Sequence, residues 1–141
     1  MTQAATSRTV VIEKEFAHPP QKVWRALTEG PLIDQWLLRN DFQPVVGHRF
    51  KFQSPAMPPH WDGIIDCEVL TVDPPSRLAY TWSALGLNST VTWTLTPTGS
   101  GTKLRMEHAG FRPDQDQAYK GATYGWQNFL GKLEHTIASL Q

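Results

Sequence analysis

The C-terminal stretch from Asp114 to Gln141 constrains the fold more than any other part of the sequence. Its apolar residues recur at spacings of three and four, which predicts a helix with one continuous apolar stripe. Asp114 and Gln117 fit a capping box that would begin this helix. A helix of roughly 25 residues is about 38 Å long, so the stripe needs a broad partner surface. The stripe consists of Tyr119, Ala122, Trp126, Phe129, Leu130, Leu133, Ile137 and Leu140.

Three glycines, Gly121, Gly125 and Gly131, interrupt the helical pattern. Each costs a helix about 1 kcal/mol relative to alanine. We interpret them as positions where another element approaches the helix closely, with a kink at one of them as the alternative.

Upstream of this helix, apolar and polar residues alternate in short segments, which is typical of antiparallel strands with one buried face. Two short helices, from Pro20 or Gln21 to Thr28 and from Gly30 to Leu37, follow the first strand and would plug one end of a curved sheet. The proline-rich residues 54–59 predict an exposed loop. The predicted strands span residues 10–16, 42–53 (as a strand or a hairpin), 64–72, 77–82, 90–96 and 103–108.

The facing of the predicted strand 64–72 stays open. A bulge would allow both of its two apolar sets to face inward at different ends of the strand. One set is Ile65, Cys67 and Val69, and the other is Ile64, Leu70 and Val72.

Charge and cysteine content exclude several classes of protein. The 141 residues carry a formal net charge of zero, which argues against nucleic-acid binding. The single cysteine, Cys67, excludes an internal disulfide framework and a cysteine-rich zinc site. No apolar run approaches the length of a membrane span, and no secretory signal is recognisable. We therefore expect a cytoplasmic protein without membrane insertion, with a flexible tail over residues 1–7 and one domain over residues 8–141.

Several short motifs occur in an order that resembles one family, the relatives of the C-terminal domain of the activator of heat shock protein 90 ATPase. This family belongs to the START or Bet v 1-like (SRPBCC) superfamily. The motifs are Phe16-Ala17-His18-Pro19-Pro20, Val23-Trp24-x-Ala26-Leu27-Thr28, Trp36, Gly47-x-Arg49-Phe50, Asp73-Pro74-Pro75-x-Arg77-Leu78-x-Tyr80-x-Trp82, Gly101-Thr102-x-Leu104, His108-x-Gly110-Phe111 and Gly125-Trp126.

The resemblance implies an α+β helix-grip fold, in which a curved antiparallel sheet of about six strands wraps around the long C-terminal helix and two short helices follow the first strand. It also implies a cavity between the sheet and that helix, which in many relatives takes an apolar ligand or lipid. A link to chaperones and to the stress response is a further implication. Because the chaperone activator has an additional N-terminal domain, we do not expect its ATPase-stimulating role for this chain.

Large aromatic side chains on the predicted inner face are candidates to line such a cavity, since they suit flat or oily ligands. The alternative is that they fill an ordinary core. A polar rim of Arg39, His60 and Asp62 would orient a carboxylate or phenol, unless these residues are ordinary exposed loop positions. The candidate lining residues are Trp36, Phe50, Phe52, Trp61, Tyr80, Trp82, Trp93, Met106, His108, Tyr119 and Trp126.

His108 is the best polar candidate because strand alternation places it on the same dry face as Leu104 and Met106. A buried imidazole needs a partner, for which Tyr80, Tyr119, a backbone carbonyl and a ligand oxygen are the candidates. The alternative is a structural histidine whose hydrogen bonds are all made within the core.

No known catalytic motif is present, and we expect neither a metal nor a cofactor. The sequence therefore predicts binding of a small hydrophobic molecule by a monomer or homodimer. One alternative is an enzyme, a cyclase or hydrolase for an aromatic or polyketide-like substrate, with His108 or the His60 and Asp62 rim as general acid or base. The other is an accessory protein that contacts a chaperone or a regulator.

Overall fold

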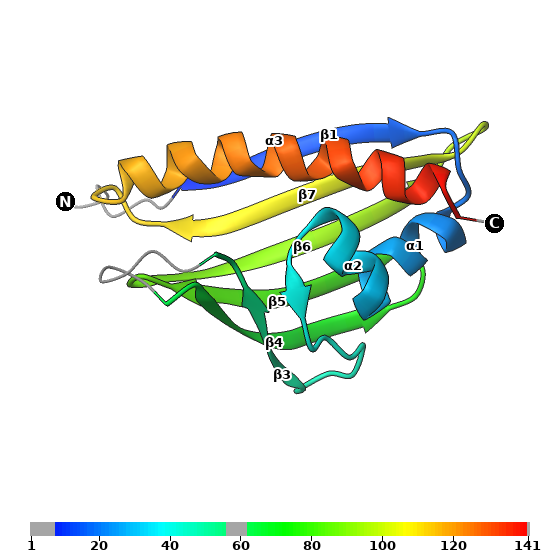
Figure 1. The fold of residues 1–141 in the computed structure, drawn as a ribbon. Coiled ribbons are helices and arrows are strands. Elements are labelled where there is room, and N and C mark those ends of the chain that lie inside the picture. The colour runs from blue at the N-terminus through cyan, green and yellow to red at the C-terminus, as the bar shows by residue number, and fades with distance from the viewer. Residues whose placement is uncertain (1–7, 56–61, 141) are drawn as a thin grey trace.

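A computed structural model describes residues 8–55 and 62–140. Within these ranges the strands form one seven-stranded antiparallel sheet in the order β1-β7-β6-β5-β4-β3-β2, and the longest helix lies along it (Figure 1). This is the predicted α+β helix-grip architecture, with a two-residue strand added to the expected six or so. The elements are β1 (Arg8–Phe16), α1 (Pro20–Thr28), α2 (Gly30–Trp36), β2 (Arg39–Asn40), β3 (Arg49–Gln53), β4 (Ile64–Asp73), β5 (Arg77–Ala84), β6 (Leu87–Pro97), β7 (Thr102–Phe111) and α3 (Asp116–Ala138).

The strand register brings the predicted apolar positions together on one face of the sheet. On β6 and β7, Trp93 lies opposite Met106 and Leu95 lies opposite Leu104, and all four side chains are buried. Side chains alternate across a strand, so the threonines of β6 at positions 92, 94 and 96 face the other way. The alternation read from the sequence is confirmed here.

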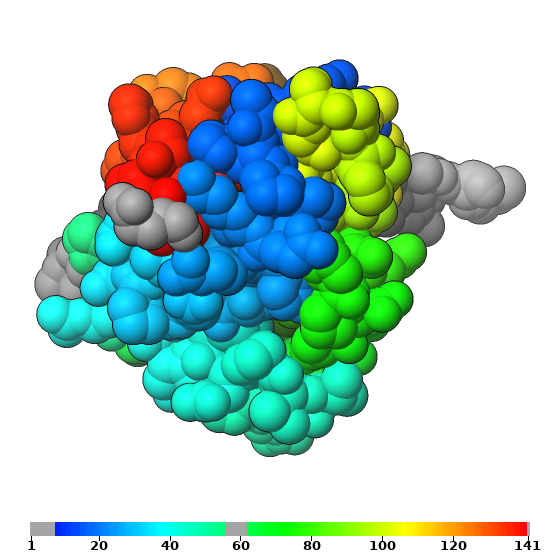
Figure 2. All heavy atoms as spheres, turned by 90° about the vertical axis from the view of Figure 1, so that its right-hand side faces the viewer, coloured from blue at the N-terminus to red at the C-terminus, as the bar shows by residue number. Residues whose placement is uncertain are grey.

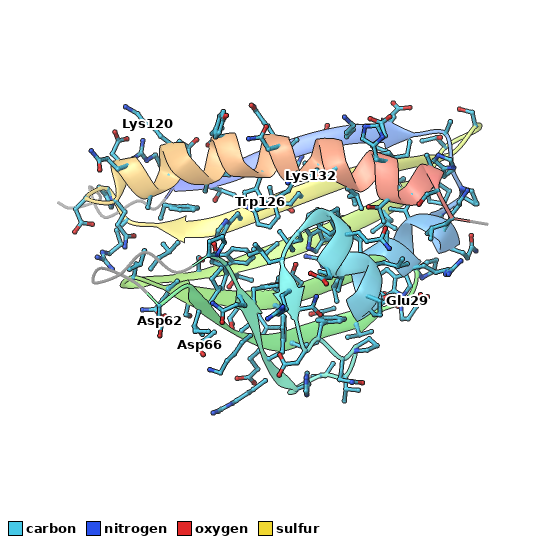
Figure 3. The ribbon with its side chains drawn as sticks, in the orientation of Figure 1. Glu29, Asp62, Asp66, Lys120, Trp126 and Lys132 are labelled. Atoms are coloured by element: carbon cyan, nitrogen blue, oxygen red, sulfur yellow. The ribbon has the colours of Figure 1, made fainter. Side chains whose placement is uncertain are left out.

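The helix α3 covers this apolar face. Its 23 residues begin at Asp116, and Trp126, Leu130, Leu133 and Ile137 are buried on the side toward the sheet. Figure 3 shows Trp126 between the helix and the sheet. These residues belong to the stripe predicted from their spacing.

The short helices α1 and α2 close one end of the sheet, as predicted. Figure 2 shows this end of the molecule covered by α1, with α2 and the end of α3 beside it. The indole N–H of Trp36 donates to the carbonyl oxygen of Ala26 at 2.8 Å, which links α2 to α1. The same indole packs edge-on against Trp93 of β6, with ring centroids 5.7 Å apart.

The predicted capping box at the start of α3 is wrong. The residue before the first helical turn is Gln115, and within the described chain its side chain makes no capping hydrogen bond. The carboxylate of Asp114 instead accepts from Nε of Arg112 at 3.1 Å. The backbone N–H of Arg112 donates to Oε1 of Gln115 at 2.8 Å, so these polar groups close the preceding loop.

Residues 42–46 are not a strand, contrary to the prediction. Phe42 is buried with its ring centroid 5.0 Å from that of Phe50, which draws this segment onto the core. Pro44 lacks the N–H that a central strand position needs. The strand that pairs with β3 on the side away from β4 is instead β2, which consists of Arg39 and Asn40.

The facing of β4 is resolved by a shift in register. Ile65, Cys67 and Val69 are buried, and the pairing with β5 is irregular between Val69 and Thr71. Beyond that point Val72 packs against the core, whereas Leu70 is exposed. A bulge of this kind moves the inward face by one residue, as the sequence allowed.

Replacing Leu133 with alanine tests whether α3 is held by its buried stripe. Leu133 is fully buried, so Leu133→Ala should lower the free energy of unfolding by about 2–5 kcal/mol through lost burial and a residual cavity. Chemical denaturation monitored by circular dichroism measures this loss. Lys132→Ala, at an exposed neighbouring position, should change stability by less than about 0.5 kcal/mol. Similar losses in both variants would contradict the assignment of the buried face.

Candidate functional site

A cavity of about 650 Å³ lies between the N-terminal half of α3 and the sheet. We call it the α3 cavity. Most of its wall is apolar, and Ser54, His108 and Gln115 contribute polar side chains. Its wall is formed by Leu38, Ser54, Ile65, Trp82, Ala84, Leu85, Leu87, His108, Phe111, Gln115, Ala118, Gly121, Ala122, Gly125, Trp126 and Phe129.

The cavity exists because one face of α3 carries almost no side chains. Ala118, Gly121, Ala122 and Gly125 all lie on the cavity wall. Apart from its chain neighbours and the nearby helix backbone, a Cβ atom added at Gly121 would meet no described atom within 4 Å, and one at Gly125 would meet only Phe129 Cε2, at 3.9 Å. The interpretation of these glycines as points of close approach is therefore wrong. They leave space where a larger residue would have filled it.

Aromatic rings from both the sheet and α3 form the rest of the cavity wall. The ring centroid of Trp82 is 5.3 Å from that of Trp126 and 5.6 Å from that of His108. Phe129 lies 5.7 Å from Trp126, and Phe111 lies 4.7 Å from His108. Tilted and edge-on contacts at these distances hold the rings in place and stabilise the wall.

His108 is held by hydrogen bonds at both ring nitrogens. The indole N–H of Trp126 donates to Nδ1 at 2.9 Å. Nδ1 is therefore the acceptor nitrogen. Nε2 carries the proton and donates it in a hydrogen bond to Oγ of Ser89 at 2.7 Å. Oγ of Ser89 in turn donates to the carbonyl oxygen of Trp82 at 2.7 Å. The predicted partners were wrong, since they did not include Ser89 or Trp126.

Burial keeps this imidazole neutral. Desolvation lowers the pKa of His108 to about 4, and the residue is 1% exposed. A proton on Nδ1 would also face the N–H of Trp126, so two donors would point at each other. In this geometry His108 connects α3 to the sheet, and neither nitrogen is free to act as a base.

The structure separates the predicted lining residues into two groups. Trp82, His108 and Trp126 lie on the cavity wall. Tyr119 lies beside it, packed on Phe111 and covered by the guanidinium of Arg8 at 4.3 Å from the ring centroid. Trp61 lies outside the described residues. The others are buried in the core and are not part of the cavity wall, namely Trp36, Phe50, Phe52, Tyr80, Trp93 and Met106.

The predicted polar rim is not assembled in the described part of the chain. Arg39 lies on a separate open groove beside α1 and α2, together with Glu29 and Asp34. Oδ1 of Asp62 accepts from the backbone N–H of Ile64 at 3.0 Å. His60 lies outside the described residues.

The described residues contain no cluster of three or more His, Cys, Asp or Glu side chains that would hold a metal ion. Cys67 is buried, and burial raises the pKa of its thiol well above the ordinary value. Over residues 8–55 and 62–140, no helix combines the length and the apolar character that crossing a membrane requires.

The buried, neutral state of His108 should make stability depend on pH. Between about pH 6.5 and pH 4 the unfolded chain binds a proton at this residue and the folded chain does not, so folding is disfavoured as the pH falls. The effect amounts to about 3 kcal/mol in total. The difference in unfolding free energy between the wild type and His108→Gln should therefore shrink by about this amount from pH 7 to pH 4. Urea denaturation across that range measures it, and a difference that is independent of pH would contradict a buried, neutral His108.

Solved structures of other proteins share this architecture. The structure of protein MLL2253 from Mesorhizobium loti is 51% identical in sequence, covers 95% of this chain and 99% of its own, and has a TM-score of 0.88. CalU16 from Micromonospora echinospora is 26% identical, with a TM-score of 0.79 over 98% of this chain and 81% of its own. DynU16, from the dynemicin biosynthetic locus, is 25% identical with a TM-score of 0.78.

The match to DynU16 covers 93% of this chain but 47% of that protein, so this chain spans about half of DynU16. No curated protein matches the sequence. A family model described as activator of Hsp90 ATPase homolog 1-like protein matches residues 17–138, which is most of the chain. The chain therefore belongs to the activator of Hsp90 ATPase homolog 1-like family, within the SRPBCC proteins of the Bet v 1-like fold.

Proposed function

We propose that this protein binds a small, mainly apolar molecule in the α3 cavity. The observation that carries the proposal is the cavity itself. Its volume of about 650 Å³ lies within the roughly 300–1,000 Å³ that is typical of small-molecule sites. Trp82 and Phe111 from the sheet face the glycine and alanine surface of α3, and Trp126 and Phe129 of α3 extend the aromatic wall, so a ligand would contact aromatic rings as well as helix backbone.

Filling the cavity would recover packing that the empty site lacks. Apolar atoms that face a void have no van der Waals partner on that side, and a ligand supplies one. Removing apolar surface from water contributes about 25 cal/mol per Å². The ring of Trp126 is already fixed by its bond to His108, so this wall is ordered before a ligand arrives and little ordering remains to oppose binding.

The same geometry favours binding over turnover. A general base needs a free nitrogen within reach of the proton that it removes. Both ring nitrogens of His108 already have partners, Trp126 and Ser89. The other described polar residues on the wall are Ser54 and Gln115. Their hydroxyl and amide groups are too weakly acidic and too weakly basic to serve as a general acid or base. The occurrence of DynU16 in the dynemicin biosynthetic locus is consistent with a role close to small-molecule chemistry.

A matched pair of glycine substitutions on α3 tests the proposal. Gly125 lies on the cavity wall and Gly131 does not, although both are half-buried in the same helix. A leucine at either position has space for its Cβ and improves helix propensity. Gly125→Leu should occupy the cavity and weaken binding roughly tenfold or more, because the ligand loses a comparable volume of apolar contact.

The measurement is a fluorescence titration with N-phenyl-1-naphthylamine, a neutral apolar probe. The wild type and Gly131→Leu should bind it with similar affinity. Equal binding by all three proteins would place the probe elsewhere, and the proposal would be wrong.

A further inference from the structure

The turn between β5 and β6 uses an unusual residue. Ala84 pairs with Leu87, so Leu85 and Gly86 form a two-residue hairpin loop. Both have positive φ, 53° for Leu85 and 81° for Gly86. A type I′ turn requires positive φ at both central positions, and it normally takes asparagine, aspartate or glycine at the first.

Leucine is unfavourable at this position for two independent reasons. In the left-handed region its Cβ crowds the following carbonyl oxygen, which disfavours residues with bulky side chains. In addition, Leu85 is 68% exposed, so much of its apolar surface remains in water. Asparagine would avoid both penalties in the same turn.

The place of Leu85 in the fold suggests what the leucine provides. Leu85 lies on the wall of the α3 cavity, between Ala84 and Leu87, which also line it. The turn is tied to the start of α3, because Nε2 of Gln115 donates to the carbonyl oxygen of Gly86 at 3.4 Å. The exposed leucine is thereby held at the side of the cavity that is open to solvent.

We propose that Leu85 is a ligand-contacting residue that forms an apolar lip on the α3 cavity and covers the exposed side of the bound molecule. This inference rests on the proposed function and adds a specific affinity determinant to it. The strained turn keeps an apolar group at the opening, where the residues that suit the backbone would place a polar group or no side chain at all.

Two substitutions at this position separate affinity from turn strain. Leu85→Asn fits the turn and replaces the apolar lip by a polar group. It should raise the melting temperature of the ligand-free protein by about 2–4 °C and weaken binding of N-phenyl-1-naphthylamine roughly three- to tenfold. Leu85→Ala removes the lip without supplying a residue that favours the turn. It should weaken binding similarly and leave the melting temperature nearly unchanged.

Val46→Asn is the control, because Val46 is 61% exposed and is not part of the cavity wall. It should leave probe affinity unchanged. If the wild type binds the probe and both Leu85 variants bind it equally well, Leu85 does not contribute to affinity. The proposal for Leu85 is then wrong, and the proposed function stands. If the wild type does not bind, the proposed function fails and the lip fails with it. A melting temperature for Leu85→Asn at or below that of the wild type would overturn the claim that leucine is kept at a structural cost.

Discussion

The hydrogen bond from the indole of Trp126 to Nδ1 of His108 joins the long helix to β7 of the sheet. His108 lies on β7 opposite Val10 of β1 and Val91 of β6, so one bond fixes the helix relative to three adjacent strands. The chain of bonds continues through Ser89 to the backbone of β5. Together with the buried stripe of α3, this connection holds the helix with its glycine and alanine face toward the cavity.

The size of the side chains determines where space remains between α3 and the sheet. Toward one end, large buried side chains such as Trp36 and Trp93 pack edge to face and fill the space. Toward the other end, glycine and alanine on α3 face aromatic rings across the cavity. Protein interiors are normally close-packed, so a persistent void of this size lowers stability. A bound apolar molecule would restore the missing contacts, which connects the packing of the fold to its proposed function.

Much of the fold was readable from the sequence, because the periodicities of α3 and of β5, β6 and β7 report directly which residues face inward. The cavity was harder to predict, since periodicity identifies a buried face without showing how far away the opposite wall lies. Trp82 and Trp93 both occupy apolar positions of alternating strands in the sequence. In the structure, however, Trp82 lines the cavity and Trp93 fills the core. For the same reason, the spacing of Gly121 and Gly125 does not show that they face open space. The turn at Leu85 and Gly86 lacks the usual asparagine signal, so its position at the cavity opening emerged only from the fold.

The most direct test of a ligand site at this place is to follow the indole N–H resonances of the tryptophans by ¹H–¹⁵N NMR during titration with N-phenyl-1-naphthylamine. Trp82 and Trp126 lie on the cavity wall, whereas the indole of Trp36 is bonded to Ala26 outside that wall. A ligand in the α3 cavity should shift the Trp82 and Trp126 resonances progressively and leave that of Trp36 in place. Unchanged Trp82 and Trp126 resonances at saturating probe, or shifts confined to Trp36, would contradict binding between the helix and the sheet.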